Sequence, residues 1–208
     1  MGRTRRPRTG RARLRMTDAL QLLLSLDEDA IRATTELRWE PATAILTLIS
    51  AWWVKGPLLV AAGWCADLRC KRAIPLVALA AMISFFVASG LNALIKDLVD
   101  RSRPPLSMDL DALIGVPGSP SFPSGHAMSA FAVAAAIAVL APRARWPVLG
   151  VAAAIAFSRV YLGVHFWIDI LAGAALGIAV GVGVAVLVRR AAARHAVAGS
   201  GTTAPAAG

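Results

Sequence analysis

The chain has 208 residues, of which 57% are hydrophobic, and its mean hydropathy is +0.64. Several apolar runs approach or exceed the roughly 20 residues that a helix needs to cross a bilayer, which excludes an ordinary soluble domain and predicts an all-α integral membrane protein. The formal net charge of +10 would also suit a nucleic-acid-binding protein, but the Arg and Lys residues cluster in tails and short loops. We therefore expect anionic lipid headgroups as partners of these basic segments, and no nucleic acid.

The N-terminal part of the chain is expected to lie on a membrane surface. Residues 1–16 form an arginine-rich tail, predicted to be disordered and to rest on anionic lipid. Residues 17–38 have the pattern of an amphipathic helix, with Leu20, Leu23 and Ile31 loosely on one side. The acidic run Asp27–Asp29 interrupts this pattern, so the helix is predicted to lie in the interface rather than to span the membrane.

The rest of the chain is predicted to form a helical bundle within a membrane domain that covers residues 17–190. The expected transmembrane helices are the five segments 42–66, 74–99, 124–141, 147–164 and 167–188. Residues 191–208 are rich in Ala, Gly, Ser and Thr and are predicted to be a disordered tail. The last span carries glycines at four-residue intervals, a spacing that lets membrane helices pack closely: Gly173, Gly177 and Gly181.

The stretch from Ser158 to Asp169 places three ionisable residues between two apolar runs, where such groups are costly to keep. His165 and Asp169 are four residues apart and share one face of a helix. The carboxylate can then hold one imidazole nitrogen and leave the other free as a nucleophile. Arg159 offers a planar set of donors that suits phosphate. This combination predicts phosphoryl transfer.

Two upstream stretches add groups suited to an anion. Lys96 and Arg103 are separated by two helical turns, so both cations can project to one side. Ser124, Gly125 and His126 open a helix of small residues, and a helix N-terminus favours a bound phosphate. Gly125 lets the backbone come close to a ligand, and His126 is placed to give a proton to a leaving oxygen. A simple helix cap is the alternative role for Ser124.

The three stretches Lys96-x6-Arg103-Pro104, Pro123-Ser124-Gly125-His126 and Ser158-Arg159-x5-His165-x3-Asp169 resemble the signature of the type 2 phosphatidic acid phosphatase (lipid phosphate phosphatase) superfamily, in its bacterial membrane branch. The resemblance spans residues 96–169 and includes every signature position. It implies that His165 forms a phosphohistidine, with Asp169 as its partner and His126 as the general acid. It implies no metal and no cofactor, and the phosphate ligands that it implies are Lys96, Arg103, Ser124, Gly125 and Arg159.

A membrane lipid phosphatase is therefore the expected function. The expected substrate is a lipid phosphate or a polyprenyl pyrophosphate, such as undecaprenyl pyrophosphate, phosphatidylglycerol phosphate or phosphatidic acid. A non-catalytic lipid-binding or lipid-transporting membrane protein is the alternative from another class, and a lipid phosphotransferase also remains open. A vanadium haloperoxidase would share the phosphate pocket, but the hydropathy of this chain argues against it. The sequence leaves the oligomeric state open.

The three motifs fall at the ends of predicted spans that face the same side of the membrane. The short loops on the opposite side are rich in Arg and Lys, so the positive-inside rule places those loops in the cytoplasm. The site is then expected on the extracytoplasmic face of a bacterial plasma membrane. The arginines of residues 1–16 argue for the reverse orientation. Lys55 near the first span is left open between snorkelling to the interface and contact with a lipid headgroup.

Overall fold

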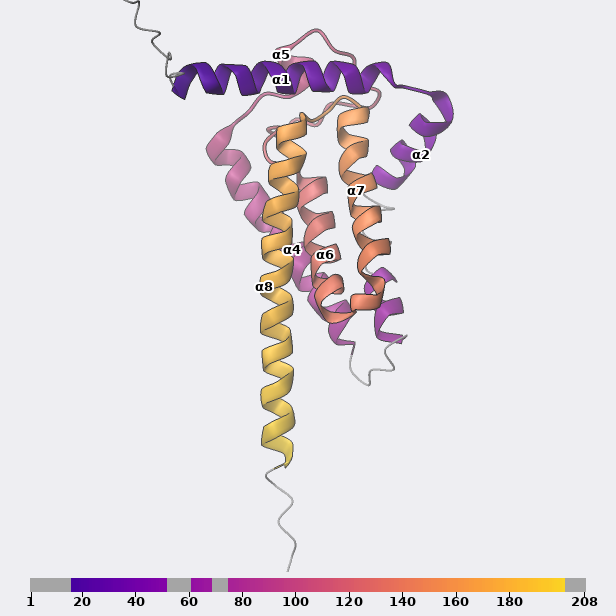
Figure 1. Ribbon diagram of the computed structural model, residues 1–208, viewed down its shortest axis with the longest axis vertical. Coiled ribbons are helices and arrows are strands. Elements are labelled where there is room, and N and C mark those ends of the chain that lie inside the picture. The colour runs from indigo at the N-terminus through magenta and orange to yellow at the C-terminus, as the bar shows by residue number, and fades with distance from the viewer. Residues whose placement is uncertain (1–15, 52–60, 69–74, 201–208) are drawn as a thin grey trace, which may run out of the picture.

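The structure is a computed structural model that describes residues 16–51, 61–68 and 75–200 (Figure 1). Every regular element in these ranges is a helix, so the predicted all-α class is confirmed for them. The elements are α1 (Met16–Glu36), α2 (Glu40–Ser50), α4 (Leu76–Val99), α5 (Pro104–Ser107), α6 (Gly125–Leu140), the 3-10 helix η1 (Pro142–Ala144), α7 (Arg145–Tyr161) and α8 (Trp167–Ser200). Residues 61–68 are also helical. Lys55, the arginines of the basic tail and part of the first predicted span lie outside the described residues.

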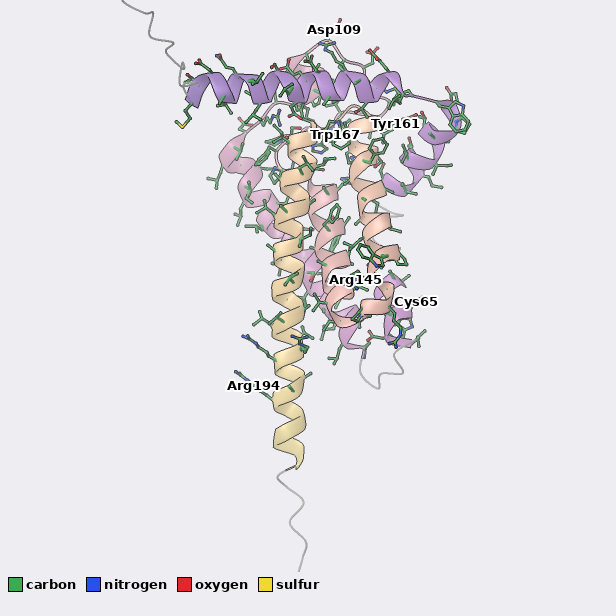
Figure 2. The ribbon with its side chains drawn as sticks, viewed as in Figure 1. Cys65, Asp109, Arg145, Tyr161, Trp167 and Arg194 are labelled. Atoms are coloured by element: carbon green, nitrogen blue, oxygen red, sulfur yellow. The ribbon has the colours of Figure 1, made fainter. Side chains whose placement is uncertain are left out.

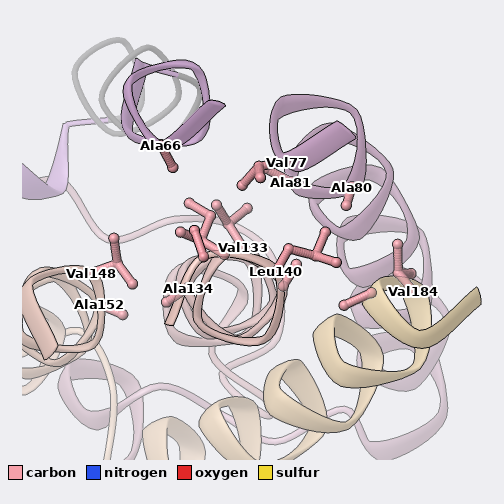
Figure 3. Close-up of a cluster of buried hydrophobic side chains, with 14 of the residues drawn as sticks. Ala66, Val77, Ala80, Ala81, Val133, Ala134, Leu140, Val148, Ala152 and Val184 are labelled. Carbon is pink, nitrogen blue, oxygen red and sulfur yellow. The ribbon is translucent and has the colours of Figure 1, made fainter. Parts of the chain in front are cut away.

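The helices α4, α6, α7 and α8 form a bundle with α6 inside it, and α1 lies across one end (Figure 1). Helix α6 suits the inner position because it consists largely of alanine and other small apolar residues, most of which are buried. Figure 3 shows Val133 and Leu140 of α6 surrounded by side chains of the neighbouring helices, such as Val77, Val148 and Val184. Close packing of these apolar side chains stabilises the bundle.

The glycines of α8 let this helix touch the backbone of α6. A Cβ atom at Gly173 would lie 2.7 Å from the carbonyl oxygen of Ser124. At Gly177 and Gly181, a Cβ atom would meet the carbonyl oxygens of Met128 and Ala132 more closely than side chains allow. The close packing that the glycine spacing predicts is therefore confirmed.

Two of the described helical segments are long and apolar enough to cross a membrane by length and composition, Leu76–Ser107 and Trp167–Arg194. Two predicted spans fall on α6 and α7, which have only 16 and 17 residues. At 1.5 Å per residue these helices reach about 24–26 Å, slightly less than the hydrocarbon core of about 30 Å. Helix α8 continues to Ser200, well into the segment predicted to be a disordered tail. The run of alanines after Arg190 has high helix propensity, which explains this extension.

Helix α1 buries one face of its second half against the bundle. Its buried residues are Asp27, Ile31 and Thr34, which recur at helical spacing, whereas Leu20 and Leu23 are more than half exposed. Ile31 lies eleven residues, about three helical turns, after Leu20, so the two residues do share a face as expected. The leucines are exposed because they belong to residues 16–26, none of which is buried, and the amphipathic interfacial role of this part of α1 stays a prediction. Ile31 is fully buried in a cluster at the α1 end of the bundle, so the side chains that fix α1 in place include a carboxylate.

Candidate active site

The three predicted motifs meet at the end of the bundle that α1 covers. Arg103, just after α4, places its Nη1 atom 3.1 Å from Nε2 of His165. The backbone N–H of Ser124, which precedes α6, donates to the carbonyl oxygen of Asp169 in the first turn of α8 at 3.0 Å. These two contacts join all three motifs, so the prediction that they face one side is confirmed.

The orientation of His165 follows from its neighbours. Its side chain lies in the turn between α7 and α8, and the residue is 2% exposed. Because a guanidinium can only donate, Nε2 of His165 accepts from Arg103, and the ring proton is on Nδ1. Nδ1 lies 3.4 Å from Oδ2 of Asp169 and 3.3 Å from Oγ of Ser121. The lone pair of Nε2 therefore faces the cations, the direction from which a phosphate would be attacked.

Asp169 is fully buried and is held by several donors. Its Oδ2 atom accepts from Oγ of Ser121 at 2.5 Å and from the backbone N–H of Phe166 at 3.0 Å. Its Oδ1 atom accepts from Nη1 of Arg101 at 2.6 Å. Since hydrogen bonds to a carboxylate favour its charged form, these contacts both orient Asp169 and keep it ionised. The predicted pairing of His165 with Asp169 is present, and it includes a serine that the sequence did not reveal. The expectation that the two residues share one helix face is wrong, because His165 lies in the turn before α8 and the chain path there brings its ring to Asp169.

His165 is neutral at physiological pH. Burial lowers the pKa of its imidazole to about 4, and the nearby positive charges of Arg103 and Arg159 also lower it. The hydrogen bond to Asp169 acts in the opposite direction, but burial is the larger cause. A neutral imidazole is the nucleophilic form, and the Nε2 lone pair that now accepts from Arg103 is the one that would attack phosphorus.

Arg103 and Lys96 lie against the loop that leads into α6. Arg103 is 3% exposed, and it donates to the carbonyl oxygens of Ser119 and Val164, each at 2.8 Å. Lys96 donates to the carbonyl oxygen of Pro120 and lies 3.5 Å from Oγ of Ser119. Two buried cations so close together create a positive potential that favours an anion. Among the described residues, no group of three or more His, Cys, Asp or Glu side chains is arranged to hold a metal ion.

Two of the predicted phosphate ligands carry buried polar atoms that have no hydrogen-bond partner among the described residues, Oγ of Ser124 and Nε of Arg159. Ser124 occupies the N-cap position of α6 but makes no capping hydrogen bond, so a simple cap does not explain it. Nη1 of Arg159 donates to Oγ of Ser50 at 3.2 Å. Because each unpaired buried polar group costs about 1–3 kcal/mol, such atoms are expected where a ligand completes the hydrogen bonding.

Gly125 has a packing role that the sequence did not indicate. A Cβ atom at this position would lie 2.8 Å from Oδ1 of Asn92 in α4. The amide of Asn92 also donates to the carbonyl oxygen of Pro123 at 3.0 Å. The glycine therefore lets α4 and α6 approach each other at the site, beside any role in binding a ligand.

His126 is linked to the same region through Ser50 at the end of α2. Its Nε2 atom lies 3.0 Å from the carbonyl oxygen of Ser50. A carbonyl can only accept, so this nitrogen carries a proton. Since Oγ of Ser50 accepts from Arg159, one residue connects the predicted general acid with a predicted phosphate ligand.

The sequence did not point to Arg101 and Asp27, which lie behind Asp169. Arg101 binds Asp169 through one end of its guanidinium and Asp27 of α1 through the other. Both residues had a visible signal. Arg101 lies inside the first motif, and Asp27 is an ionisable residue within an apolar helical pattern. Their partners, however, depend on how α1 docks on the bundle.

Comparison with known proteins gives the family. Residues 75–193, more than half of the chain, match the PAP2 superfamily. The decaprenylphosphoryl-5-phosphoribose phosphatase of Mycobacterium tuberculosis is 41% identical over 101 residues, covering 46% of this chain and 52% of that protein. The phosphatidylglycerophosphatase B of Bacillus subtilis is 37% identical over 100 residues, covering 42% of this chain and 46% of that protein. The undecaprenyl-diphosphatase of Sulfolobus acidocaldarius is 34% identical over 99 residues, covering 46% and 48%. The matched part thus spans about half the length of these relatives.

Two solved structures share the fold. The crystal structure of a transmembrane PAP2 type phosphatidylglycerolphosphate phosphatase from Bacillus subtilis aligns with a TM-score of 0.66 and 29% identity, covering 84% of this chain and 89% of that one. The crystal structure of Aquifex aeolicus LpxE aligns with a TM-score of 0.61 and 22% identity, covering 75% and 92%, and shows the fold alone. The membrane location of such relatives agrees with the two long apolar helical segments described above. Since the family match includes all three motifs that the fold brings together, the chain belongs to the PAP2 superfamily.

Proposed function

We propose that this protein is an integral membrane lipid phosphatase that works through a phosphohistidine intermediate. The observation that carries this proposal is the neutral His165, whose Nε2 lone pair faces Arg103 in a buried cationic site. The unpaired atoms of Ser124 and Arg159 supply further donors for a phosphate. A protein that only binds or transports lipid needs such donors but no oriented nucleophile, so the arrangement favours catalysis.

In the first step, Nε2 of His165 attacks the phosphorus atom. The N–P bond forms while the bond between phosphorus and the leaving oxygen breaks, and His126, which enters the step as an imidazolium, gives a proton to that oxygen and becomes neutral. The imidazole of His165 becomes positively charged in this step, and Asp169 stabilises it through the proton on Nδ1. Lys96, Arg103 and Arg159 bind the equatorial oxygens, where negative charge must be held in the transition state.

In the second step, water hydrolyses the phosphohistidine. His126, now without its proton, takes a proton from the water as the oxygen attacks phosphorus. The N–P bond breaks, inorganic phosphate leaves, and His165 returns to its neutral form. With a pyrophosphate substrate, the first leaving group is the lipid monophosphate.

The substrate is proposed to be a lipid phosphate or a polyprenyl pyrophosphate. The names of the relatives point to lipids of several kinds, including undecaprenyl diphosphate and decaprenylphosphoryl phosphoribose. A panel should therefore contain undecaprenyl pyrophosphate, phosphatidylglycerol phosphate, phosphatidic acid and a phosphorylated polyprenyl phosphosugar. Phosphate release from one of them by the purified protein in detergent would identify the substrate class.

The test of the mechanism is the His165→Ala variant in the same panel. Removing a covalent nucleophile should lower phosphate release by at least about 10³-fold. The control is His195→Ala, which changes a histidine far along α8 and should leave release unchanged. Retention of activity within about threefold in the His165→Ala protein would refute the nucleophile assignment. Transfer of the phosphoryl group to a second lipid, with no free phosphate, would indicate a phosphotransferase instead.

We also propose that the site faces away from the cytoplasm, in a bundle of about five spans with α1 lying in the interface. The exposed leucines of α1 support an interfacial position for this helix. Figure 2 places Arg145 and Arg194 towards the end of the bundle away from α1, whereas Asp109 and Tyr161 lie at the α1 end. The basic residues of this far end agree with the positive-inside rule if the α1 end is extracytoplasmic. The α1 end also carries arginines, but Arg32 and Arg101 there are bound to oxygens of Asp109, Asp27 and Asp169.

Single cysteines test this orientation. Ser107 lies at the α1 end and Ala144 at the opposite end, and each would be changed to cysteine in a background without Cys65 and Cys70. An impermeant thiol reagent added to intact cells should label position 107 and spare position 144. Labelling of position 144 alone would reverse the orientation and direct the substrate search to lipids of the inner leaflet.

A further inference from the structure

Arg101 lies between two buried carboxylates that come from opposite ends of the sequence. Its Nη1 atom is 2.6 Å from Oδ1 of Asp169, and its Nη2 atom is 2.9 Å from Oδ2 of Asp27. Asp27 is 4% exposed and Asp169 is 0% exposed. The guanidinium also stacks on the ring of Phe166, with Cζ 4.1 Å from the ring centroid. Arg101 is therefore fixed on three sides.

The geometry points to Asp27 and Arg101 as positioning residues for the His165–Asp169 pair, an inference that rests on the proposed phosphatase function. Arg101 orients Asp169 by binding the oxygen that does not face His165. Asp27 in turn binds Arg101, so that the positive charge of Arg101 is divided between two carboxylates. Asp169 then keeps enough negative charge to stabilise the imidazolium that forms when His165 is phosphorylated.

The charge of Asp27 matters because Arg101 competes with His165 for Asp169. Without the charge of Asp27, the full charge of Arg101 would act on Asp169 alone. The carboxylate would then stabilise the charged ring of His165 less well, and phosphohistidine formation would become slower. Residues that orient metal ligands through hydrogen bonds typically change activity by about 10–100-fold when altered. Asp27 acts on Asp169 in the same indirect way, and we expect the lower end of that range for it.

Asp27 also accepts a hydrogen bond that helps to hold α1 on the bundle, and the experiment must separate this structural role from the effect of its charge. Its Oδ1 atom accepts from the backbone N–H of Ile168 at 3.1 Å, at the start of α8. Two further contacts hold α1 near the site, from Nε1 of Trp167 to Oγ1 of Thr34 at 3.0 Å and from Nη1 of Arg32 to the carbonyl oxygen of Asp109 at 3.1 Å. Asparagine at position 27 keeps the shape and an acceptor oxygen but removes the charge, whereas glutamate keeps the charge and changes the shape.

The experiment compares Asp27→Asn and Asp27→Glu with Asp29→Asn, an exposed carboxylate two residues further along α1. The kcat and KM values for the lipid phosphate that the wild-type protein hydrolyses are measured in detergent, together with the dissociation constant of orthovanadate. We expect Asp27→Asn to lower kcat about tenfold and to change KM less than twofold. Asp29→Asn should match the wild type, and Asp27→Glu should retain more kcat than Asp27→Asn. If Asp27→Asn is more active than Asp27→Glu, shape rather than charge determines the effect, and the inference is wrong.

A double variant tests the coupling through Arg101. If Asp27 acts by balancing the charge of Arg101, its effect disappears once that charge is removed. The kcat of Asp27→Asn/Arg101→Gln should then be no lower than that of Arg101→Gln alone. If the fold-losses in kcat of the two single variants multiply in the double variant, the inference is wrong. A wild-type protein that releases phosphate while Asp27→Asn equals Asp29→Asn overturns the inference alone. A wild-type protein that releases no phosphate and binds no orthovanadate overturns the proposed function, and the inference with it.

Discussion

Replacing Gly177 with alanine is expected to push α8 away from α6. A Cβ atom at this position would overlap the carbonyl oxygen of Met128 and would lie 3.0 Å from the backbone nitrogen of Ala132. Both are backbone atoms, so the clash cannot be relieved by rotating a side chain. Gly183 lies on the same helix, and nothing lies within 4 Å of the position of its Cβ atom. Gly183→Ala is therefore a matched control with the same chemical change.

The two substitutions should change the free energy of unfolding in opposite directions. In a helix, alanine is favoured over glycine by up to about 1 kcal/mol. Overpacking at a tight contact typically costs about 1–3 kcal/mol. Because the clash at Gly177 is with backbone atoms, we take a cost of about 2–3 kcal/mol, the upper part of that range. After the gain of about 1 kcal/mol in helix propensity, Gly177→Ala should lower the free energy of unfolding by about 1–2 kcal/mol. Gly183→Ala should raise it by up to about 1 kcal/mol. With Tm shifts of about 2–4 °C per kcal/mol for a chain of this size, a difference of about 2–3 kcal/mol should separate the two Tm values by about 4–12 °C.

Thermal unfolding of both variants in the same detergent measures this difference. Phosphate release gives a second readout, because Ser124 and Asp169 are joined across the α6–α8 contact. Gly177→Ala should lose more kcat than Gly183→Ala. A Tm of Gly177→Ala that equals or exceeds that of Gly183→Ala would refute the reasoning, since α6 and α8 would then move apart without a loss of stability.

The remaining predictions concern the chemistry of the site. Because the pKa of His165 is lowered to about 4, protonation should remove the nucleophile only as the pH falls through that value, and not through the ordinary value of 6.5. The histidine Cε1 resonance that is absent from the His165→Ala variant should report this titration, and a midpoint near 6.5 would contradict it. Activity should survive millimolar EDTA, because Lys96, Arg103 and Arg159 supply the positive charge. Loss of activity with EDTA and recovery with magnesium would contradict this. Orthovanadate should inhibit competitively as a mimic of five-coordinate phosphorus, and the absence of inhibition at millimolar concentration would count against the mechanism.

The parts of the fold that the sequence could predict are those that depend on local pattern. The segment of α4 is predominantly apolar and bounded by Pro75 and Asp100, so its extent was predicted within two residues at each end. The four-residue spacing of His165 and Asp169 predicted their contact, although His165 lies in the turn before α8 and not on the helix that the spacing was taken to indicate. The glycine spacing in α8 likewise predicted a close helix contact. It did not indicate that the partner would be α6, because the choice of partner helix depends on the tertiary structure.

The parts that could not be predicted depend on how separate segments dock. Ser121 lies in a loop without regular structure, and only the path of that loop brings it within 2.5 Å of Asp169. Asp27 was interpreted only as part of the acidic run that keeps its helix in the membrane interface. It is buried because the face of α1 that carries Ile31 turns towards the bundle, where Arg101 compensates the carboxylate. Hydrophobic periodicity cannot identify such a residue, because an ion pair between distant segments leaves no local pattern.

The contact between α6 and α8 connects stability with the proposed chemistry. The carbonyl oxygen of Ser124 lies beside Gly173, and the N–H of the same serine donates to the carbonyl oxygen of Asp169. The start of α6 is therefore fixed relative to Asp169 by backbone atoms on both sides of Ser124. Backbone contacts of this kind leave little freedom for sliding, and an error of about 1 Å in such a site can lower a rate by about 100-fold. The small residues of α8 thus set the distance between the helix that carries His126 and the helix that carries Asp169. Substitutions along this stripe should change catalysis and stability together, even where they touch no residue of the site.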